Sequence, residues 1–208
     1  MEQLDTIVVG AGSAEAEALS ADDRMLCEIV QREVLRLNEL VSDMMDLTKP
    51  RPPAPRALDV AQVIREVVAL AQRLGRAAED VRVIAEGAES PMFGLFDASQ
   101  FRQVLWNLVK NAVEASGAGA TVTVSAQELG ANEIEVRVRD EGQGMTEAER
   151  AQVFDAFFTT RTKGTGLGLA VVRRIVDDHS AVGATLEVES EKDRGTTFLL
   201  RFHAAKEV

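Results

Sequence analysis

Apolar and charged side chains alternate with a helical period in the first part of the chain. Between Leu26 and Thr48 an apolar side chain recurs every three or four positions, and charged side chains fill the opposite face. This pattern predicts an amphipathic helix of about 25 residues. Because such a helix has no core of its own, we expect it to pack in a helical hairpin or a dimeric bundle. The apolar stripe consists of Leu26, Ile29, Val30, Val34, Leu37, Leu40, Val41, Met44 and Met45.

A proline-rich stretch follows this helix. Four of the five prolines of the chain lie between Pro50 and Pro55. Prolines at this density end a helix and favour an extended backbone, so they predict a linker. We therefore expect a helical segment over residues 1–49, a linker over 50–58 and a folded domain over 59–208.

The remaining pattern predicts both helices and strands. Short runs with alternating apolar and polar residues are typical of half-buried strands, and longer runs with spacings of three and four indicate helices. Helices are predicted at Val63–Leu74, Ser99–Ala115 and Leu167–Asp178. Strands are predicted at Val81–Ala85, Met92–Phe96, Thr121–Ala126, Ile134–Arg139, Thr185–Glu189 and Thr197–Phe202. The order of these elements predicts an α+β fold, an α/β sandwich with an antiparallel or mixed sheet and helices on one face.

Composition narrows the function classes. The 208 residues include 34 acidic and 23 basic side chains, a net charge of −11 that disfavours binding to nucleic acid. No run approaches the roughly 20 apolar residues that span a bilayer, and no signal peptide is recognisable, so we expect a cytoplasmic protein without direct membrane insertion. The single cysteine, Cys27, is predicted to be a buried, inert thiol. One cysteine and two histidines make structural zinc implausible.

A glycine-containing segment near the start of the chain invites comparison with dinucleotide-binding turns. Thr6–Glu15 reads as a short strand followed by Gly10 and Gly12. The position of the third glycine is occupied by Glu15, and a long amphipathic helix follows where a second strand would be needed. The segment is better interpreted as a lead-in to that helix.

The helix predicted at Ser99–Ala115 carries two amides on one face. Asn107 and Asn111 are four residues apart, with Lys110 and Glu114 beside them. Two aligned amides and a lysine can hold a hydrated cation and the phosphates that it neutralises. Taken alone, the same residues also fit an ordinary solvent-facing side of a helix.

Two glycine-rich segments add to this picture. Asp140 follows a predicted strand directly and precedes Gly142 and Gly144, which places a carboxylate that only accepts hydrogen bonds beside an approachable backbone. An amine is the matching donor, although a plain turn would also fit. Further along, Gly164 to Gly168 stand at the start of a predicted helix, next to Arg161 and Lys163. The free N–H groups and the positive dipole end of a helix start, together with two basic side chains, favour the binding of an anion.

In this order, the motifs resemble the catalytic ATP-binding domain of two-component sensor histidine kinases, within the gyrase, Hsp90, histidine kinase and MutL type of ATPase. Asn107 to Ala115 resembles the N box, Asp140 to Gly144 the first glycine box, Phe154 to Phe158 the F box and Gly164 to Gly168 the second glycine box. The similarity covers residues 59–208 and implies a Bergerat-type ATP-binding fold. Thr159 to Thr165 resemble the short ATP lid of nitrogen-regulation-type kinases.

The resemblance also implies roles for individual residues. Asn111 would coordinate Mg²⁺ with the help of Asn107, and Asn107 and Lys110 would take part in catalysis. Asn107 stands where related ATPases carry a water-activating glutamate, and an amide cannot act as a general base, which favours a kinase over a hydrolase. The implied ATP-binding residues are Asp140, Gly142, Gly144, Phe158, Arg161, Lys163, Gly164, Thr165, Gly166, Leu167, Gly168 and Thr196.

The chain departs from the family in its histidines. His179 and His203 are the only two, and neither lies in the His-Glu motif of a phosphoacceptor helix. We expect His179 to be a cation at a helix carboxyl end and His203 to be solvated. The leading hypothesis is the ATP-binding core of a sensor histidine kinase that phosphorylates a histidine outside this chain, with a response regulator or a separate histidine-bearing domain as partner and a homodimer formed through the helical segment.

Two alternatives remain from the sequence. The chain could be a degenerate kinase that serves as a nucleotide-binding dimerisation or interaction module in signalling. It could also be a serine kinase similar to anti-sigma factors, but those lack the preceding helix and the proline linker.

Overall fold

The computed structural model describes residues 21–48, 52–75, 81–130, 132–161 and 164–206. Contacts divide the chain into two units, Met1–Ser42 and Asp43–Val208, which are treated separately below. The glycine-containing segment Thr6–Glu15 and the predicted phosphate-binding Lys163 lie outside the described residues. The domain boundaries drawn from the sequence stay a prediction.

The predicted long helix is present as α2, which spans Ala21–Thr48. Its apolar stripe is exposed, with Leu26 at 58% and Leu37 at 60% of full exposure. Cys27 is exposed as well, so the prediction of a buried thiol is wrong. The physical reason is that a single helix cannot cover its own apolar stripe.

The second unit is built on a five-stranded sheet with the order β2-β4-β5-β7-β6. β2 pairs with β4 in parallel, whereas the other neighbours are antiparallel, so the sheet is mixed as predicted. A separate antiparallel pair joins β1 (Arg56–Asp59), which begins in the predicted linker, to β3 (Phe93–Phe96). The sheet strands are β2 (Arg82–Glu86), β4 (Thr121–Leu129), β5 (Glu133–Arg139), β6 (Thr185–Glu191) and β7 (Gly195–His203).

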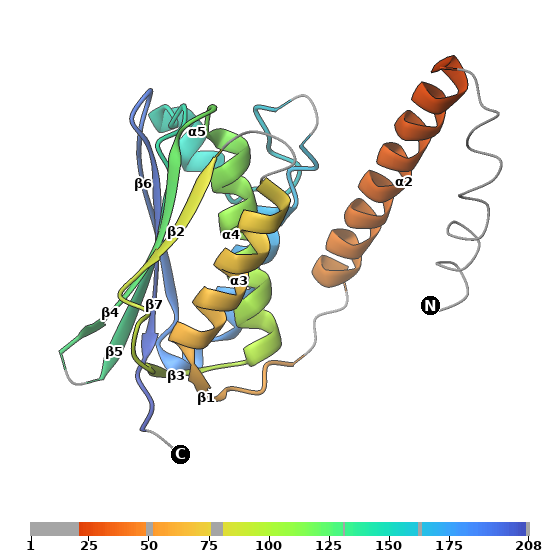
Figure 1. Ribbon diagram of the computed structural model, residues 1–208. Helices are drawn as coiled ribbons and strands as arrows, with labels where there is room; N and C mark the ends of the chain where they lie inside the picture. Colours follow the sequence, from red (N-terminus) through yellow and green to blue (C-terminus); the bar gives the residue numbers. More distant parts are fainter. Residues whose placement is uncertain (1–20, 49–51, 76–80, 131, 162–163, 207–208) are drawn as a thin grey trace. The chain divides into compact units, whose positions relative to one another are not determined.

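Helices cover one face of this sheet. α3 (Val60–Gly75), α4 (Ala98–Ala115) and α6 (Gly168–Asp178) form the helical layer, and the short α5 (Glu147–Gln152) and the 3₁₀ turn η1 (Ser180–Val182) complete the unit. Figure 1 shows α3 and α4 running side by side along the sheet. The predicted α/β sandwich is confirmed.

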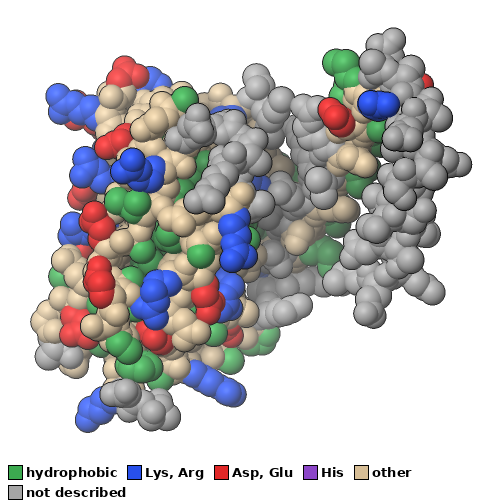
Figure 2. All heavy atoms as spheres, viewed as in Figure 1, with side chains coloured by type: hydrophobic (Ala, Val, Ile, Leu, Met, Phe, Trp, Pro, Cys, Tyr) green, Lys and Arg blue, Asp and Glu red, His purple; other side chains and the backbone are tan. Residues whose placement is uncertain are grey.

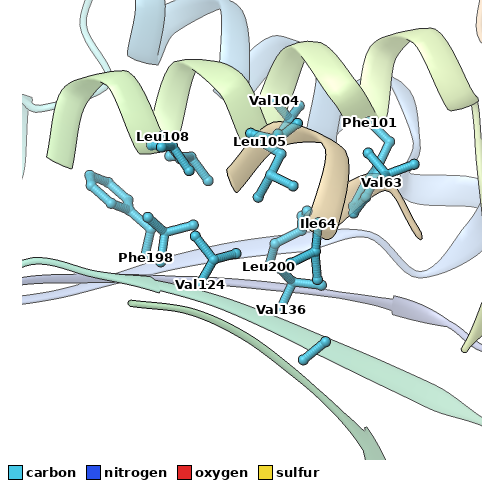
Figure 3. Packing of buried hydrophobic residues seen from close by; sticks show 14 of the residues in the cluster. Val63, Ile64, Phe101, Val104, Leu105, Leu108, Val124, Val136, Phe198 and Leu200 are labelled. Atoms are coloured by element: carbon cyan, nitrogen blue, oxygen red, sulfur yellow. The ribbon is translucent and has the colours of Figure 1, made fainter. Parts of the chain in front are cut away.

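The core lies between the helical layer and the sheet. Side chains of α4 point toward the strands and meet apolar side chains at alternate positions of β4, β5 and β7 (Figure 3). Phe101, Val104 and Phe198 are at most 1% exposed. This packing fixes α4 against the sheet, and α4 carries the amides singled out in the sequence.

The surface of the second unit is mixed in charge. On the face that Figure 2 shows, basic and acidic side chains are interspersed with small apolar patches. Among the described helices, none combines the length and the apolar character needed to cross a membrane.

Candidate nucleotide-binding site

The start of α4 is fixed by a side-chain cap. Asp97 precedes the helix, and its Oδ1 accepts hydrogen bonds from the backbone N–H groups of Ser99 (3.0 Å) and Gln100 (3.1 Å). These bonds satisfy two of the amides that every helix leaves unpaired at its start. Because the cap sets where the helix begins, it also sets which side chains its later turns present.

His179 connects this cap to the end of α6. Its Nε2 accepts a hydrogen bond from the backbone N–H of Asp97 (3.2 Å), and its Nδ1 lies 2.8 Å from the carbonyl oxygen of Ile175. A nitrogen that accepts an N–H bond carries no proton, so Nδ1 is the donor and the ring is neutral. The predicted cation at this position is therefore wrong: the ring is 1% exposed and stacks on Phe96 at 3.8 Å between ring centroids.

The two asparagines singled out in the sequence, Asn107 and Asn111, both lie on α4 and are four residues apart, as predicted. Asn107, Lys110 and Asn111 are all half-buried. The Nδ2 of Asn107 donates to the carbonyl oxygen of Gly168 (3.3 Å), the first residue of α6. This bond joins residues 61 positions apart and brings the N box into direct contact with the second glycine box.

The segment predicted as a lid also reaches α4, through Arg161. Its guanidinium makes an ion pair with Glu114 (Nη1 to Oε2, 2.6 Å) and donates to the backbone carbonyl oxygen of Asn111 (Nη2 to O, 3.0 Å). Three quarters of the Arg161 side chain is covered, since its exposed fraction is 25%. A basic side chain is therefore held beside the predicted metal and phosphate residues.

The glycine-rich start of α6 folds back on the F box. Gly166 has φ +68°, and its carbonyl oxygen accepts the N–H of Phe157 (2.9 Å). A Cβ at Gly166 would lie 2.5 Å from the carbonyl carbon of Phe157, so both the dihedral angle and the close contact require glycine. Leu167 is fully buried and its N–H is 3.3 Å from the Thr165 hydroxyl. Gly164 and Phe158 are half-buried parts of the same loop.

Asp140 lies at the end of β5 with an exposed fraction of 2%. Its Oδ1 accepts the backbone N–H groups of Gly142 (2.8 Å) and Thr196 (3.2 Å). Both bonds go to Oδ1, and no described residue donates a hydrogen bond to Oδ2. Burial raises the pKa of Asp140, although the two amide bonds and the positive charge of Arg161 act in the opposite direction. This buried carboxylate offers a free acceptor oxygen to a ligand.

The loop after Asp140 is packed tightly between α4 and the β6–β7 hairpin. The N–H of Gln143 donates to the carbonyl oxygen of Ala115 (3.3 Å), and its own carbonyl accepts the N–H of Asp193 (2.8 Å). Gly144 has φ +57°, and a Cβ there would collide with the Glu191 carbonyl. The first glycine box, the end of α4 and the strand carrying Thr196 therefore form one continuous wall.

Two residues of this region had no role assigned from the sequence. Glu114 shares the amide face of α4, so its spacing could have suggested the pair with Arg161. Ser190 on β6 bonds to the backbone N–H of Met145, directly after the first glycine box, and to Thr196 on the paired strand β7; the residue pattern around Ser190 does not identify it, because the Met145 contact joins positions 45 apart.

The donors present fit a phosphate-bound magnesium ion better than a metal held by protein alone. In the part of the chain that the structure describes, no three His, Cys, Asp or Glu side chains gather into a metal site. Mg²⁺ prefers oxygen ligands and keeps several waters, binding through few protein groups and the phosphates of its ligand. The amide oxygens of Asn107 and Asn111 suit this mode.

The chain matches a known family over this region. Residues 96–206 match the family described as "Histidine kinase-, DNA gyrase B-, and HSP90-like ATPase". That match takes in α4, the first glycine box and the start of α6.

The chain is also similar to bacterial kinases. The chain is 34% identical over 188 residues to the sensor histidine kinase ZraS of Escherichia coli (strain K12), which covers 90% of this chain and 39% of ZraS. It is 32% identical over 176 residues to sporulation kinase A of Bacillus subtilis (strain 168), over 84% of this chain and 28% of that kinase. The chain thus spans about two fifths or less of the length of these relatives.

Solved structures agree with the fold. The catalytic domain of histidine kinase ThkA superposes with a TM-score of 0.64 at 28% identity, over 72% of this chain and 95% of that domain. ThkA in complex with the response regulator protein TrrA gives a TM-score of 0.73 at 25% identity, over 96% of this chain and 57% of ThkA.

Proposed function

Because the chain belongs to the family of histidine kinase-, DNA gyrase B- and HSP90-like ATPases, we propose that its folded domain binds Mg-ATP and provides the γ-phosphoryl group for transfer to a histidine. The observation that carries the proposal is the buried carboxylate of Asp140, whose Oδ1 is occupied by two backbone amides while Oδ2 is open. An acceptor in this setting matches the exocyclic amine of adenine.

The other contacts supply the phosphate end of the site. The glycine-rich start of α6 presents backbone N–H groups and the positive end of the helix dipole to an anion. Asn111, assisted by Asn107, would hold Mg²⁺, which neutralises phosphate charge when it is bound. Two basic residues add positive charge next to Asn111. Lys110 lies on the same helix, α4, and Arg161 is held against that helix by its hydrogen bond to the Asn111 carbonyl oxygen.

The phosphoacceptor is proposed to lie outside this chain. His179 is buried and uses both ring nitrogens in hydrogen bonds, so neither is available as a nucleophile. His203 is an exposed side chain at the end of β7, paired in register with Glu133. A histidine on a separate domain or polypeptide, in the cytoplasm where ATP is abundant, completes the proposed reaction.

Two partners belong to the same proposal. The exposed apolar stripe of α2 supports a homodimer formed through this helix, since an uncovered stripe of that length favours association. A response regulator would accept the phosphoryl group from the histidine, by analogy with ThkA, whose complex with TrrA has been solved.

Phosphoryl transfer to a histidine-bearing domain is the direct test. The protein is mixed with γ-labelled ATP, Mg²⁺ and a candidate dimerisation domain, and acid-labile, base-stable label on that domain is measured. Transfer that requires Mg²⁺ and disappears in Asp140→Asn supports the kinase function. ATP binding without transfer to any candidate domain favours the second function, a nucleotide-binding interaction module.

A further inference from the structure

We propose that Ser190 determines the base selectivity of the nucleotide site by fixing the direction in which the Thr196 hydroxyl donates its proton. This inference rests on the proposed ATP site and adds a residue that does not itself contact the nucleotide. Ser190 lies on β6 directly opposite Thr196 on β7.

Ser190 makes three polar contacts through one hydroxyl oxygen. Oγ accepts the backbone N–H of Met145 (2.9 Å), donates to the carbonyl oxygen of Gly195 (3.0 Å) and lies 2.9 Å from Oγ1 of Thr196. A serine hydroxyl has one proton and two lone pairs. Since its proton is used on the Gly195 carbonyl, the contact with Thr196 must be a bond that Thr196 donates.

The consequence is a threonine that can only accept from a ligand. With its proton committed to Ser190, the Thr196 hydroxyl presents lone pairs alone on its other side. Thr196 is in direct contact with Asp140, because its N–H donates to Oδ1 (3.2 Å) and its carbonyl accepts the Asp140 N–H (2.9 Å). Both side chains are at least nine tenths buried. Asp140 and Thr196 therefore contribute two acceptor side chains to the wall of the proposed base site.

Such a wall distinguishes a 6-amino purine from a 6-oxo purine. The amine of adenine has two N–H donors, whereas the carbonyl oxygen of hypoxanthine would face acceptors and remain unpaired. Sites built around buried hydrogen-bonding groups reject a ligand that cannot satisfy them. In Ser190→Ala the Thr196 hydroxyl loses its acceptor and becomes free to donate to a carbonyl oxygen.

The experiment compares ATP and ITP, which differ at the base, by titration calorimetry in the presence of Mg²⁺. We expect the wild-type protein to prefer ATP, and we expect Ser190→Ala to reduce the ATP-to-ITP affinity ratio about tenfold, the value of one hydrogen bond. Ser190→Thr, which keeps the hydroxyl, should restore the ratio. Ser125→Ala, at a half-buried serine of β4, serves as the matched control and should leave the ratio unchanged.

Thr196→Val provides a second route if Ser190→Ala does not fold. Removing the hydroxyl should lower the ratio by a similar factor, and adding Ser190→Ala to Thr196→Val should then change nothing further. Equal losses of ATP and ITP affinity in Ser190→Ala, or an unchanged ratio in Thr196→Val, would overturn the inference. A wild-type protein that binds neither nucleotide would instead refute the proposed function.

Discussion

The substitution Asp140→Asn should weaken ATP binding without lowering the stability of the fold. In Asp140→Asn the side-chain oxygen can still accept the N–H groups of Gly142 and Thr196, because both bonds use Oδ1. The amide NH₂ then occupies the position of Oδ2 and presents a donor where the adenine amine also donates. The loop geometry is preserved while the recognition of the base is inverted.

The magnitude follows from these contacts. A hydrogen bond to a charged acceptor contributes about 1.5–3 kcal/mol, and a buried donor left unpaired costs about 1–3 kcal/mol. Together they amount to about 2.5–6 kcal/mol, which corresponds to a loss of ATP affinity of roughly 60-fold or more. Titration calorimetry with Mg-ATP measures this loss.

The same substitution should not destabilise the fold. Burial raises the pKa of Asp140, so the group favours folding below its ordinary pKa, and that contribution is lost as the pH rises through the folded-state value. At neutral pH the buried charge is therefore a cost that the neutral amide removes. We expect Asp140→Asn to unfold at the same temperature as the wild type or higher. Unchanged ATP affinity would refute the adenine assignment, and a large drop in thermal stability would refute the analysis of the contacts.

Three further substitutions test neighbouring parts of the site. Asn111→Asp should abolish Mg²⁺-dependent phosphoryl transfer because it places a negative charge beside the phosphates, and retained transfer would exclude the metal role. Glu114→Gln removes a partly exposed ion pair, so it should change the unfolding free energy by less than about 1 kcal/mol while tightening ATP binding through the released Arg161; weaker binding would contradict this. His179→Ala should cost about 3–5 kcal/mol in urea unfolding, since it removes a stacked ring and two hydrogen bonds, and a cost below about 1 kcal/mol would show that the ring is not structural.

The long periodic segments were predictable because their pattern is local. α4 and α6 differ from the predicted helices by one residue at the start, and β5 likewise. α3 begins at Val60, three residues before the predicted Val63, because Oδ1 of Asp59 accepts the N–H of Gln62 and caps the first turn. The apolar pattern alone does not show where such a cap lies.

The missed elements are short or depend on distant partners. β1 has four residues, lies next to the prolines and exists only because it pairs with β3. α5 has no fully buried residue, so the apolar period gives no sign of it. Its capping box of Thr146 and Glu149 was present in the sequence and could have indicated a helix start.

The sequence motifs identified most residues of the site, but they did not predict the hydrogen bonds between those residues. The order of the glycine boxes and the spacing of Asn107 and Asn111 pointed to the residues around α4. The predicted charge of His179 was wrong because the protonation of its ring is set by the hydrogen bond that Nε2 accepts from the N–H of Asp97, which is 82 positions away. The contacts of Ser190 with Met145 and Thr196 arise from the pairing of β6 with β7 and from the loop after β5, and no local rule contains them.

The most direct test of the central claim is a map of backbone amide chemical shifts during titration of the protein with Mg-ATP. The account predicts saturable binding with the largest shifts at Gly142, Thr196, Gly166 and Gly168, and loss of these shifts in Asp140→Asn. Saturable binding with shifts confined to other parts of the chain, or no binding at millimolar ATP, would contradict it.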